Sequence, residues 1–361
     1  MKAFKLIFSG GGTGGHIYPA LAIASGFKNT RPDTDVLFVG ANDKMEMKIV
    51  PKADFKIKGL WISGLQRSLS LQNLLFPFKV LTSLLQSLFI LLRFKPDAVI
   101  GTGGFASWPL LQVAQWLGYP TLIQEQNSFP GIANRLLGNK ADRICVAYEK
   151  MEHYFPLHKL RITGNPIRFN MLNSGISANA AKSFFGLDPQ KSTLVIIGGS
   201  LGAKRINELV ANELLFFKTH KFQILWQCGA IYFDKYKNLS CPEVVIKSFV
   251  YEMEKLYSAA DIIISRAGAG SLSELSCVGK PLILIPSPNV TANHQFHNAQ
   301  VLVDEKAAFL VEECDIPESF KITFKKLATD KNLQKEMGQN LKALSKPYSA
   351  NQIVKEIMEL L

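Results

Sequence analysis

Cysteine is scarce in this sequence, with five thiols among 361 residues and no two of them in a CxxC spacing. Disulfide frameworks and tetrahedral zinc sites both need paired or closely spaced cysteines. The odd number and the wide scatter argue against both kinds of site. They favour ordinary core thiols in a reduced, cytoplasmic protein.

Long apolar runs are also missing. Spanning a bilayer takes about 18–20 uninterrupted apolar residues. The nearest stretch, residues 74–94, is interrupted by Pro77, Lys79, Gln86 and Arg93. The chain runs from Met1 directly into a strand-like segment, without the regions of a signal peptide. We therefore expect neither a transmembrane span nor a targeting segment.

Acidic residues are in deficit, because 29 Asp and Glu stand against 41 Lys and Arg, for a net charge of +12. Such a balance favours acidic partners: nucleic acid, an anionic membrane surface or phosphorylated substrates. The lysines are dispersed and no nucleic-acid-binding motif is present, so no nucleic-acid partner is expected.

Strand-like apolar runs alternate with helical patterns along the whole chain. The runs are 4–8, 36–39, 98–100, 121–123 and 143–146, then 193–197, 223–226, 244–246, 262–264 and 282–285. The alternation predicts an α/β fold with parallel sheets. A stretch without apolar strand-like runs separates the two groups, and we place a linker near residues 164–170. Ligands of doubly wound sheets lie beyond the carboxyl ends of the strands. Two such domains that face each other would hold a site in the cleft between them.

The stretch FSGGGTGGHIYPALAIA, residues 8–24, places five glycines between an expected strand and an expected helix. Pro19 is expected in the first turn of that helix. Free backbone N–H groups at such a turn bind anions or polar ligands. His16 stands at the mouth of the turn, and a phosphate cradle alone does not need a histidine.

Further strand-to-helix turns carry glycine at residues 101–111 and 196–210. In the second of them Ser200 lies among three glycines, ahead of an amphipathic helix. Phosphate on that helix N-terminus, with the serine hydroxyl as an extra donor, is one interpretation. A tight strand-to-helix turn without a ligand is the other.

The stretch SRAGAGSLSELSCVGKPLILIP, residues 265–286, opens another helix. Ser271 and Ser273 are candidate caps, and Glu274 is expected in the first helical turn. A carboxylate there can accept hydrogen bonds from two ribose hydroxyls. Alternatively, it is an acidic residue that the helix dipole favours at a helix start.

Taken together, the motifs resemble one known family. GGTGGHIYPALA, GTGGFAS, QEQN, GNPIR, GGSLGA and SRAGAGSLSE follow one another in the order seen in the MurG family, and the resemblance covers essentially the whole chain. It implies a GT-B fold, in which two Rossmann-like domains with parallel sheets face across a cleft. It also implies an acceptor- and membrane-binding domain, 1–164, and a UDP-GlcNAc-binding domain, 165–346. A last helix, about 347–361, would pack back on the first domain.

The activity implied by the resemblance is inverting transfer of N-acetylglucosamine from UDP-GlcNAc to the C4 hydroxyl of a muramyl sugar. The acceptor is lipid I, an undecaprenyl-diphosphate-linked muramyl peptide, and the product is lipid II for peptidoglycan synthesis, cell shape and division. No cofactor is required. A divalent metal ion can assist, but the sequence presents no metal site. Proteins of a cell-wall assembly are further candidate partners.

The resemblance also implies substrate-binding roles for single residues. They are Thr13, Gly14, Gly15, Asn127, Arg168, Ser200, Val250, Ala269, Gly270, Ser271, Leu272, Ser273, Glu274 and Gln295. The first four are expected at the donor and its diphosphate, Arg168 at the donor across the cleft, and Ser200 at uridine or phosphate. Val250, where the family usually has isoleucine, is expected to contact uracil through its backbone. Residues 269–274 are expected at diphosphate and ribose, and Gln295 at the sugar hydroxyls.

Two residues are candidates for the general base that the reaction needs. Imidazole, with a pKa near 6.5, suits proton removal at neutral pH, which favours His16; a histidine that caps the helix and orients the loop is the alternative. Glu125 is the second candidate base, and otherwise a carboxylate that orients Asn127 or the acceptor.

Leucine and phenylalanine recur at helical spacing in one segment, at Leu74, Phe78, Leu81 and Leu84, between basic flanks. A core helix explains most such stripes. This segment is apolar on more than one face, however, and basic flanks favour anionic lipid. The resemblance favours peripheral attachment to the cytoplasmic face of the inner membrane.

Rival enzyme classes remain open at this point. Gly10, Gly12 and Gly15 formally match the GxGxxG fingerprint of nicotinamide- or flavin-dependent oxidoreductases, although His16 follows at once and no acidic residue directly follows the run 36–39. A diacylglycerol galactosyltransferase or a lipid A disaccharide synthase would share the cleft. The sequence leaves the acceptor's peptide and the oligomeric state open.

Overall fold

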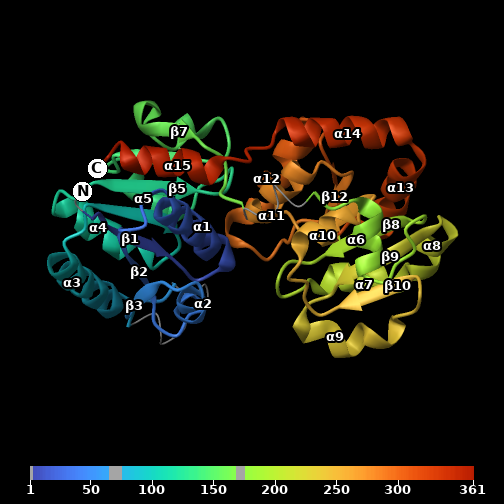
Figure 1. The fold of residues 1–361 in the computed structure, drawn as a ribbon, viewed down its shortest axis with the longest axis horizontal. Helices are drawn as coiled ribbons and strands as arrows, with labels where there is room; N and C mark the ends of the chain where they lie inside the picture. Colours follow the sequence, from blue (N-terminus) through green and yellow to red (C-terminus); the bar gives the residue numbers. More distant parts are fainter. Residues whose placement is uncertain (1–2, 65–74, 168–174) are drawn as a thin grey trace. The chain divides into compact units, whose positions relative to one another are not determined.

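The computed structural model describes residues 3–64, 75–167 and 175–361 (Figure 1). The chain forms two compact units. Unit 1 comprises Met1–Ile167 and Lys346–Leu361, and unit 2 comprises Arg168–Ser345. Leu74 and Arg168, both singled out in the sequence, lie outside the described residues.

Unit 1 is built on a parallel sheet with the strand order β3-β2-β1-β4-β5-β6-β7. The strands are β1 (Lys5–Gly10), β2 (Asp35–Ala41), β3 (Lys56–Leu60), β4 (Ala98–Gly103), β5 (Thr121–Glu125), β6 (Arg143–Val146) and β7 (Leu160–Ile162). The α-helices are α1 (Gly14–Thr30), α2 (Glu46–Lys52), α3 (Phe76–Phe94), α4 (Ser107–Trp116), α5 (Ile132–Gly138) and α15 (Ser349–Met358), with 3-10 turns at Met151–His153 and Leu157–Lys159. The order reverses between β1 and β4, where doubly wound sheets bind ligands.

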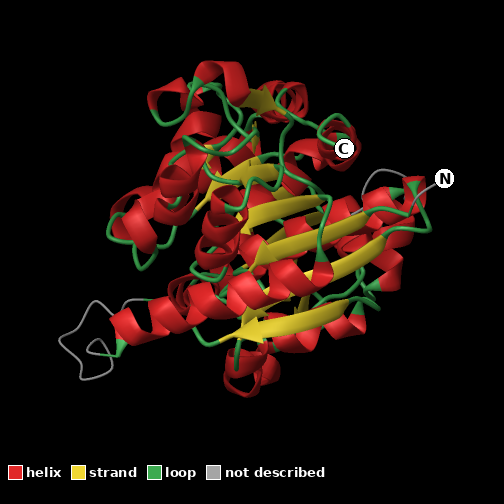
Figure 2. Ribbon diagram, turned by 90° about the vertical axis from the view of Figure 1, so that its left-hand side faces the viewer, coloured by secondary structure: helices red, strands yellow, loops and turns green. Residues whose placement is uncertain are grey.

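The central strands of unit 1 are buried on both faces, as a parallel sheet covered by helices requires. Leu6 and Phe8 of β1 pack with residues of α1 and α15, and Ile7 packs with residues of α3, α4 and α5 on the other face. Figure 2, in which unit 1 faces the viewer, shows its strands side by side with helices on either face. This layering leaves the strand ends as the place where loops gather.

Helix α15 is far from α1 in sequence but packs beside it. A Cβ on Gly26 of α1 would lie 3.5 Å from a methyl group of Val354. Glu356 of α15 forms ion pairs with Arg143 and Arg161, at 3.2 and 3.4 Å. The final helix is therefore part of the helix layer of unit 1.

Unit 2 repeats the plan with the strand order β10-β9-β8-β11-β12-β13. The strands are β8 (Ser192–Ile197), β9 (Phe222–Gln227), β10 (Val244–Lys247), β11 (Ile262–Ser265), β12 (Leu282–Leu284) and β13 (Phe309–Leu310). The α-helices are α6 (Ala178–Phe184), α7 (Lys204–Asn212), α8 (Leu214–Thr219), α9 (Ala230–Tyr236), α10 (Met253–Ser258), α11 (Ala269–Val278), α12 (His294–Asp304), α13 (Ile316–Thr329) and α14 (Lys331–Ala343), with 3-10 turns at Lys237–Leu239 and Thr291–Asn293. All neighbouring strands pair in parallel.

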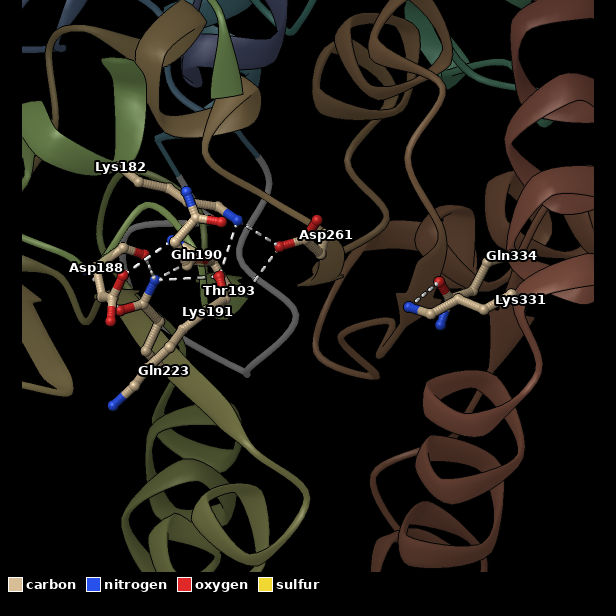
Figure 3. A network of polar contacts seen from close by, with 9 residues as sticks. All are labelled: Lys182, Asp188, Gln190, Lys191, Thr193, Gln223, Asp261, Lys331 and Gln334. Carbon is tan, nitrogen blue, oxygen red and sulfur yellow. Dashed lines mark hydrogen bonds and ion pairs between the residues drawn. The ribbon is translucent and has the colours of Figure 1, made fainter. Parts of the chain in front are cut away.

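A polar network ties the amino ends of β8 and β11 together (Figure 3). The ammonium group of Lys182, buried on α6, donates to Asp261 at 2.9 Å and to the Lys191 carbonyl at 2.8 Å. Asp261 also accepts from the backbone N–H of Thr193 at 2.8 Å. These contacts lie at the amino ends of the strands. They therefore stabilise the end of the sheet opposite the glycine loops, which follow the carboxyl ends of the strands.

The architecture confirms the prediction of an α/β protein with two Rossmann-like units on parallel sheets. Each apolar run in the sequence coincides with a strand. The strands that the pattern does not indicate, β3, β7 and β13, lie at sheet edges. Edge strands bury less surface, so half-exposed sequences such as KIKGL in β3 lack a continuous apolar run.

Candidate active site

The first glycine turn, residues 11–13, joins β1 to α1. Gly12 has a φ of +84°, which L side chains rarely adopt. The carbonyl of Thr13 accepts from the backbone N–H groups of His16 and Ile17, at 3.1 and 3.3 Å, and the helix begins at Gly14. Pro19 therefore lies inside the helix, and its expected place in the first turn is wrong: these bonds start the helix one turn earlier.

His16 is half-buried and is held by its Nδ1 atom. That nitrogen lies 3.1 Å from the carbonyl oxygen of Gly11 and 3.2 Å from the Thr13 hydroxyl. A carbonyl only accepts hydrogen bonds, so Nδ1 carries the proton and the lone pair is on Nε2. Gly103 and Gly104, both with positive φ, face the ring, since Cβ atoms there would lie 3.1 Å from it. The imidazole is thus presented in the tautomer that a base requires.

Glu125 ends β5 and is 1% exposed. One carboxylate oxygen accepts from the backbone and side-chain N–H groups of Asn127, at 2.9 and 3.1 Å. The other accepts from Gly131 at 3.0 Å and from the Asn134 amide at 2.8 Å. Four donors hold this carboxylate, which suits it to organising the loop that carries Asn127.

The other expected residues of this region lie at the amino end of α1. Thr13 and Gly15 are exposed, and Gly14 is half-buried. The Asn134 amide lies near the Gly103 backbone, which His16 also faces. The structure therefore brings residues 13–16 together with the turn after β4 and with the Glu125–Asn127 loop.

In unit 2, the loop between β8 and α7 carries Ser200, whose side chain is exposed. Gly202 has a φ of +79°, and a Cβ there would lie 1.9 Å from the carbonyl oxygen of Cys228. Gly199 also has a positive φ, but space around its missing Cβ is open. Close backbone packing against the β9 end thus fixes the loop and presents Ser200 outward.

Gln227, at the end of β9, links two of the expected ligand loops. Its buried amide donates to the Gly199 carbonyl at 3.2 Å and accepts from the Val250 N–H at 2.9 Å. Sequence reasoning missed this residue, because it reads only as the end of an apolar strand. Since Gln227 uses the Val250 N–H, the Val250 carbonyl is the group suited to a nucleobase N–H.

Helix α11 begins at Ala269 after Gly268, and no side chain caps it. Ser273 instead donates to the carbonyl of Ala269 at 3.0 Å, four residues back. The expectation that Ser271 and Ser273 cap this helix is therefore wrong. Gly270 is exposed with open space at its missing Cβ, whereas the side chain of Leu272 is buried. Ser271 lies half-buried between them. Ligands at this end would therefore meet backbone N–H groups.

Glu274 is the sixth residue of α11, so its expected position in the first turn is wrong. Five residues already separate it from the helix start, which removes the explanation by the helix dipole. It is buried and accepts from the Tyr257 hydroxyl of α10 at 3.2 Å. Burial, and secondly the charge of Glu274, raise the pKa of the Cys277 thiol to about 11.

Gln295 lines a cavity of about 540 Å³ at the carboxyl ends of the unit 2 strands. Its side-chain oxygen accepts from the Ser287 N–H at 2.9 Å. The lining is Gly198, Gly202, Ala203, Lys204, Arg205, Tyr232, Arg266, Ser287, Asn289, Gln295 and Glu313. Arg266 forms an ion pair with Glu313 and donates to the Ile285 carbonyl at 2.9 Å. No role was assigned to Arg266 from the sequence, although it is the second residue of the motif SRAGAGSLSE.

The model of the glycosyltransferase family 28 N-terminal domain matches residues 6–146, and that of the C-terminal domain matches residues 193–354. The chain belongs to glycosyltransferase family 28. This membership makes it a glycosyltransferase and removes the oxidoreductase alternative.

Family 28 relatives match over the full length. The chain is 52% identical to the UDP-N-acetylglucosamine–N-acetylmuramyl-(pentapeptide) pyrophosphoryl-undecaprenol N-acetylglucosamine transferase of Flavobacterium psychrophilum, over 100% of this chain and 98% of that one. It is 49% identical to the enzyme of the same name from Christiangramia forsetii, with the same coverage. A crystal structure of Acinetobacter baumannii MurG matches with a TM-score of 0.79 at 26% identity, covering 99% of this chain and 100% of that one. The resemblance to MurG and the GT-B fold class are confirmed.

Helix α3 of this family 28 chain has an apolar outer face. Phe78 and Leu81 are 64% and 58% exposed, and Leu85 and Phe89 continue the row. Leu84 instead packs against the core, because it lies on the inner face of the helix. Its expected place among the membrane-facing residues is therefore wrong.

Within the described ranges, α3 is the one helix whose length and composition would suffice to cross a membrane. The polar residues that interrupt this stretch in the sequence, among them Lys79 and Arg93, lie within the helix, and the expectation that it does not span stays a prediction. The inner face of α3 carries the buried Ser83 and Ser87, and the helix packs on α4 and β3. In the same described ranges, no three His, Cys, Asp or Glu side chains are placed to hold a metal ion.

Proposed function

We propose that this protein transfers N-acetylglucosamine from UDP-GlcNAc to the C4 hydroxyl of the muramyl sugar of lipid I. The product is lipid II, and the anomeric configuration inverts. Relatives at 52% and 49% identity carry the name of this activity over their whole length. The observation on which the proposal mainly rests is His16, whose Nδ1 is held by Gly11 so that Nε2 is the basic nitrogen.

His16 acts as the general base. Its Nε2 takes the proton of the acceptor hydroxyl as that oxygen attacks the anomeric carbon from the face opposite UDP. Such assistance contributes about 10²–10⁴-fold to the rate. Glu125 is the weaker candidate, since four N–H groups already occupy its carboxylate. We assign it the orientation of Asn127.

Unit 2 binds the donor. Uracil N3–H would donate to the Val250 carbonyl, whose own N–H is held by Gln227. Glu274, buried beside the Tyr257 hydroxyl at 3.2 Å, would accept from ribose hydroxyls. The N-terminus of α11, at Ala269, Gly270 and Ser271, would receive the diphosphate. Leu272 would take part through its N–H alone, because its side chain is buried.

The remaining assignments follow from family position and local geometry. Ser200 is exposed on the loop between β8 and α7 and would donate to uridine or phosphate. Gln295 would meet the sugar hydroxyls from the edge of the unit 2 cavity. Arg168 is assigned to the departing diphosphate, and Thr13, Gly14 and Gly15 to the donor side of the acceptor site. Backbone N–H groups and cations stabilise the leaving UDP, so a metal ion is not required.

The acceptor carries a polyprenyl chain, so unit 1 should work at a membrane surface. The outer face of α3, with Phe78, Leu81, Leu85 and Phe89, would insert at the cytoplasmic face of the inner membrane. The net charge of +12 would add attraction to anionic lipid. Proteins of a cell-wall assembly remain candidate partners at that surface.

A donor and acceptor panel tests the proposal. Purified protein is mixed with a short-chain polyprenyl-diphosphate muramyl pentapeptide and, separately, UDP-GlcNAc, UDP-GalNAc, UDP-Glc and UDP-Gal. We expect efficient transfer from UDP-GlcNAc alone and a β-1,4-linked product by NMR. Diacylglycerol is offered as a second acceptor with the same donors, and transfer only to diacylglycerol would overturn the proposal in favour of another lipid glycosyltransferase.

A further inference from the structure

Glu46 is an acidic residue that the proposed mechanism does not use. It is the first residue of α2, and its side chain is 0% exposed. One carboxylate oxygen accepts from the Ala41 N–H at 3.0 Å and the other from the Gly12 N–H at 3.1 Å. An exposed acid at a helix start needs no such enclosure. The question is what a buried carboxylate does behind the first glycine turn.

The peptide group between Gly11 and Gly12 answers this question. Its N–H donates to Glu46 at 3.1 Å, and its carbonyl lies 3.1 Å from Nδ1 of His16. A single planar peptide thus connects the carboxylate to the imidazole. We propose that Glu46 is a positioning residue that acts on His16 through this peptide; the proposal rests on the proposed function of His16 as the base.

The charge of Glu46 acts on His16 through the hydrogen bonds of the Gly11–Gly12 peptide. Both oxygens of Glu46 face N–H donors, so the ionised carboxylate is the form that fits. A carboxylate at the N–H end polarises the peptide and makes its carbonyl a stronger acceptor, because hydrogen bonds in series strengthen one another. The stronger acceptor holds the proton on Nδ1 and raises the basicity of Nε2. A carboxylate that bonds directly to a catalytic histidine has the same effect.

The glycines around Glu46 show that this placement is built into the turn. A Cβ on Gly11 would lie 2.2 Å from a carboxylate oxygen, and a Cβ on Gly40 would lie 2.5 Å from Cγ of Glu46. Neither glycine has a positive φ. Close approach of Glu46, rather than backbone conformation, therefore accounts for glycine at both positions.

The other groups around His16 also influence its basicity and have to be compared with Glu46. The Thr13 hydroxyl, the backbone of Gly103 and Gly104, and the Asn134 amide beyond them are neutral. Glu125 acts from farther away, through its bond to Asn134 at 2.8 Å. A change at Glu46 alters the bond to Nδ1, whereas these groups stay in place.

The experiment measures His16 directly by ¹⁵N NMR of the uniformly labelled full chain, in Glu46→Gln and in the parent. The signal is assigned as the one lost in His16→Gln among six histidines. We expect the Nε2–H tautomer to gain population in Glu46→Gln and the His16 titration to move to lower pH. We also expect kcat to fall by about tenfold or more, as for other residues that orient a functional side chain, with KM nearly unchanged.

Asp43→Asn is the matched control. Asp43 is exposed and has a φ of +61°, which asparagine tolerates, so this variant removes one carboxylate near Glu46 without strain. It should match the parent in every readout. If Glu46→Gln does not fold, Glu46→Asp keeps the charge but shortens its reach, and a smaller shift of the same sign is expected.

Unchanged ¹⁵N shifts and titration of His16 in the folded Glu46 variant would overturn the proposal and leave Glu46 as a residue that closes the turn between β2 and α2. The NMR readout needs no substrate. If His16→Ala retains turnover, the base assignment fails, while the effect of Glu46 on the histidine is still decided by the spectra.

Discussion

The glycine turns after β1 and after β8 occupy equivalent places in two sheets of the same order, yet different groups support them. Behind the first turn lies the carboxylate of Glu46, and the turn holds His16. Behind the second lies the neutral amide of Gln227, and Lys204 and Arg205 follow the loop. A carboxylate raises the basicity of a nearby imidazole, whereas an amide flanked by cations suits an anion. With the roles proposed above, the same backbone turn would serve proton transfer in one unit and anion binding in the other.

The largest effect on activity is expected from removing His16, which the first turn holds. His16→Ala should lower kcat by about 10²–10⁴-fold, because the base acts in the transition state. Affinity for UDP, measured by calorimetry, should hardly change, since the nucleotide is assigned to unit 2 in the proposed function. Turnover within a few-fold of the parent would reject His16 as the base and return attention to Glu125.

A smaller effect, on the binding of UDP, is expected from removing the carboxylate of Glu274 in unit 2. Glu274→Ala should weaken UDP binding by about 1.5–3 kcal/mol, the scale of hydrogen bonds to a charged group. Free diphosphate should lose much less affinity. Tyr257→Phe is the control, because it removes the hydroxyl that donates to Glu274 at 3.2 Å and leaves the carboxylate in place. Equal losses for UDP and diphosphate would mean that Glu274 supports the loop instead of ribose.

The outer face of α3 distinguishes unit 1 from unit 2 in another way. Replacing Phe78 and Leu81 with serine should reduce binding to anionic vesicles by about tenfold or more, since burying each side chain contributes about 1.5–3 kcal/mol. The melting temperature should stay unchanged, because both side chains are exposed. Activity on a short-chain soluble acceptor should also remain.

Leu84→Ser is the matched control for this double variant. Leu84 packs against the core of unit 1, so the change should lower the melting temperature and spare vesicle binding. A double variant that melts far below the parent would show that the outer face is core. In that case the membrane assignment fails.

The smallest effect concerns the group behind the second turn. Gln227→Leu leaves the Gly199 carbonyl and the Val250 N–H without this amide. The change should weaken UDP binding by about fivefold, equivalent to about 1 kcal/mol, the usual net value of a hydrogen bond. The His16 titration should not move. A shift of His16 in this variant would contradict the separation of the two turns.

Local patterns predicted most of the fold because buried parallel strands are continuous apolar runs. That relation fails for β3, β7 and β13, where one side of the strand has no partner. Helix starts were harder to place. Pro19 and Glu274 are typical of a first helical turn, but backbone bonds from Thr13 and after Gly268 begin both helices earlier.

The sequence indicated candidate site residues that lie within a glycine motif. It did not indicate residues that only support such a motif from another part of the chain. Thr13, His16 and Ser200 lie on the turns that the glycines mark. Glu46 and Gln227 contact those turns only through tertiary folding, and an isolated glutamate in a charged stretch reads as solvent-exposed. Gly11 and Gly40 leave room for the Glu46 side chain without a positive φ, but only the structure distinguishes such glycines from those that a turn requires.

The place of α15 beside α1 has a consequence for how the chain acquires its structure. Unit 2 is continuous from Arg168 to Ser345, whereas Val354 completes a layer that begins at Gly26. On a ribosome, the groove beside α1 stays open until more than three hundred further residues have been made, and closing so long a loop is costly in entropy. Unit 2 can thus become native while unit 1 still exposes apolar surface. Nascent chains should depend on chaperones at that stage.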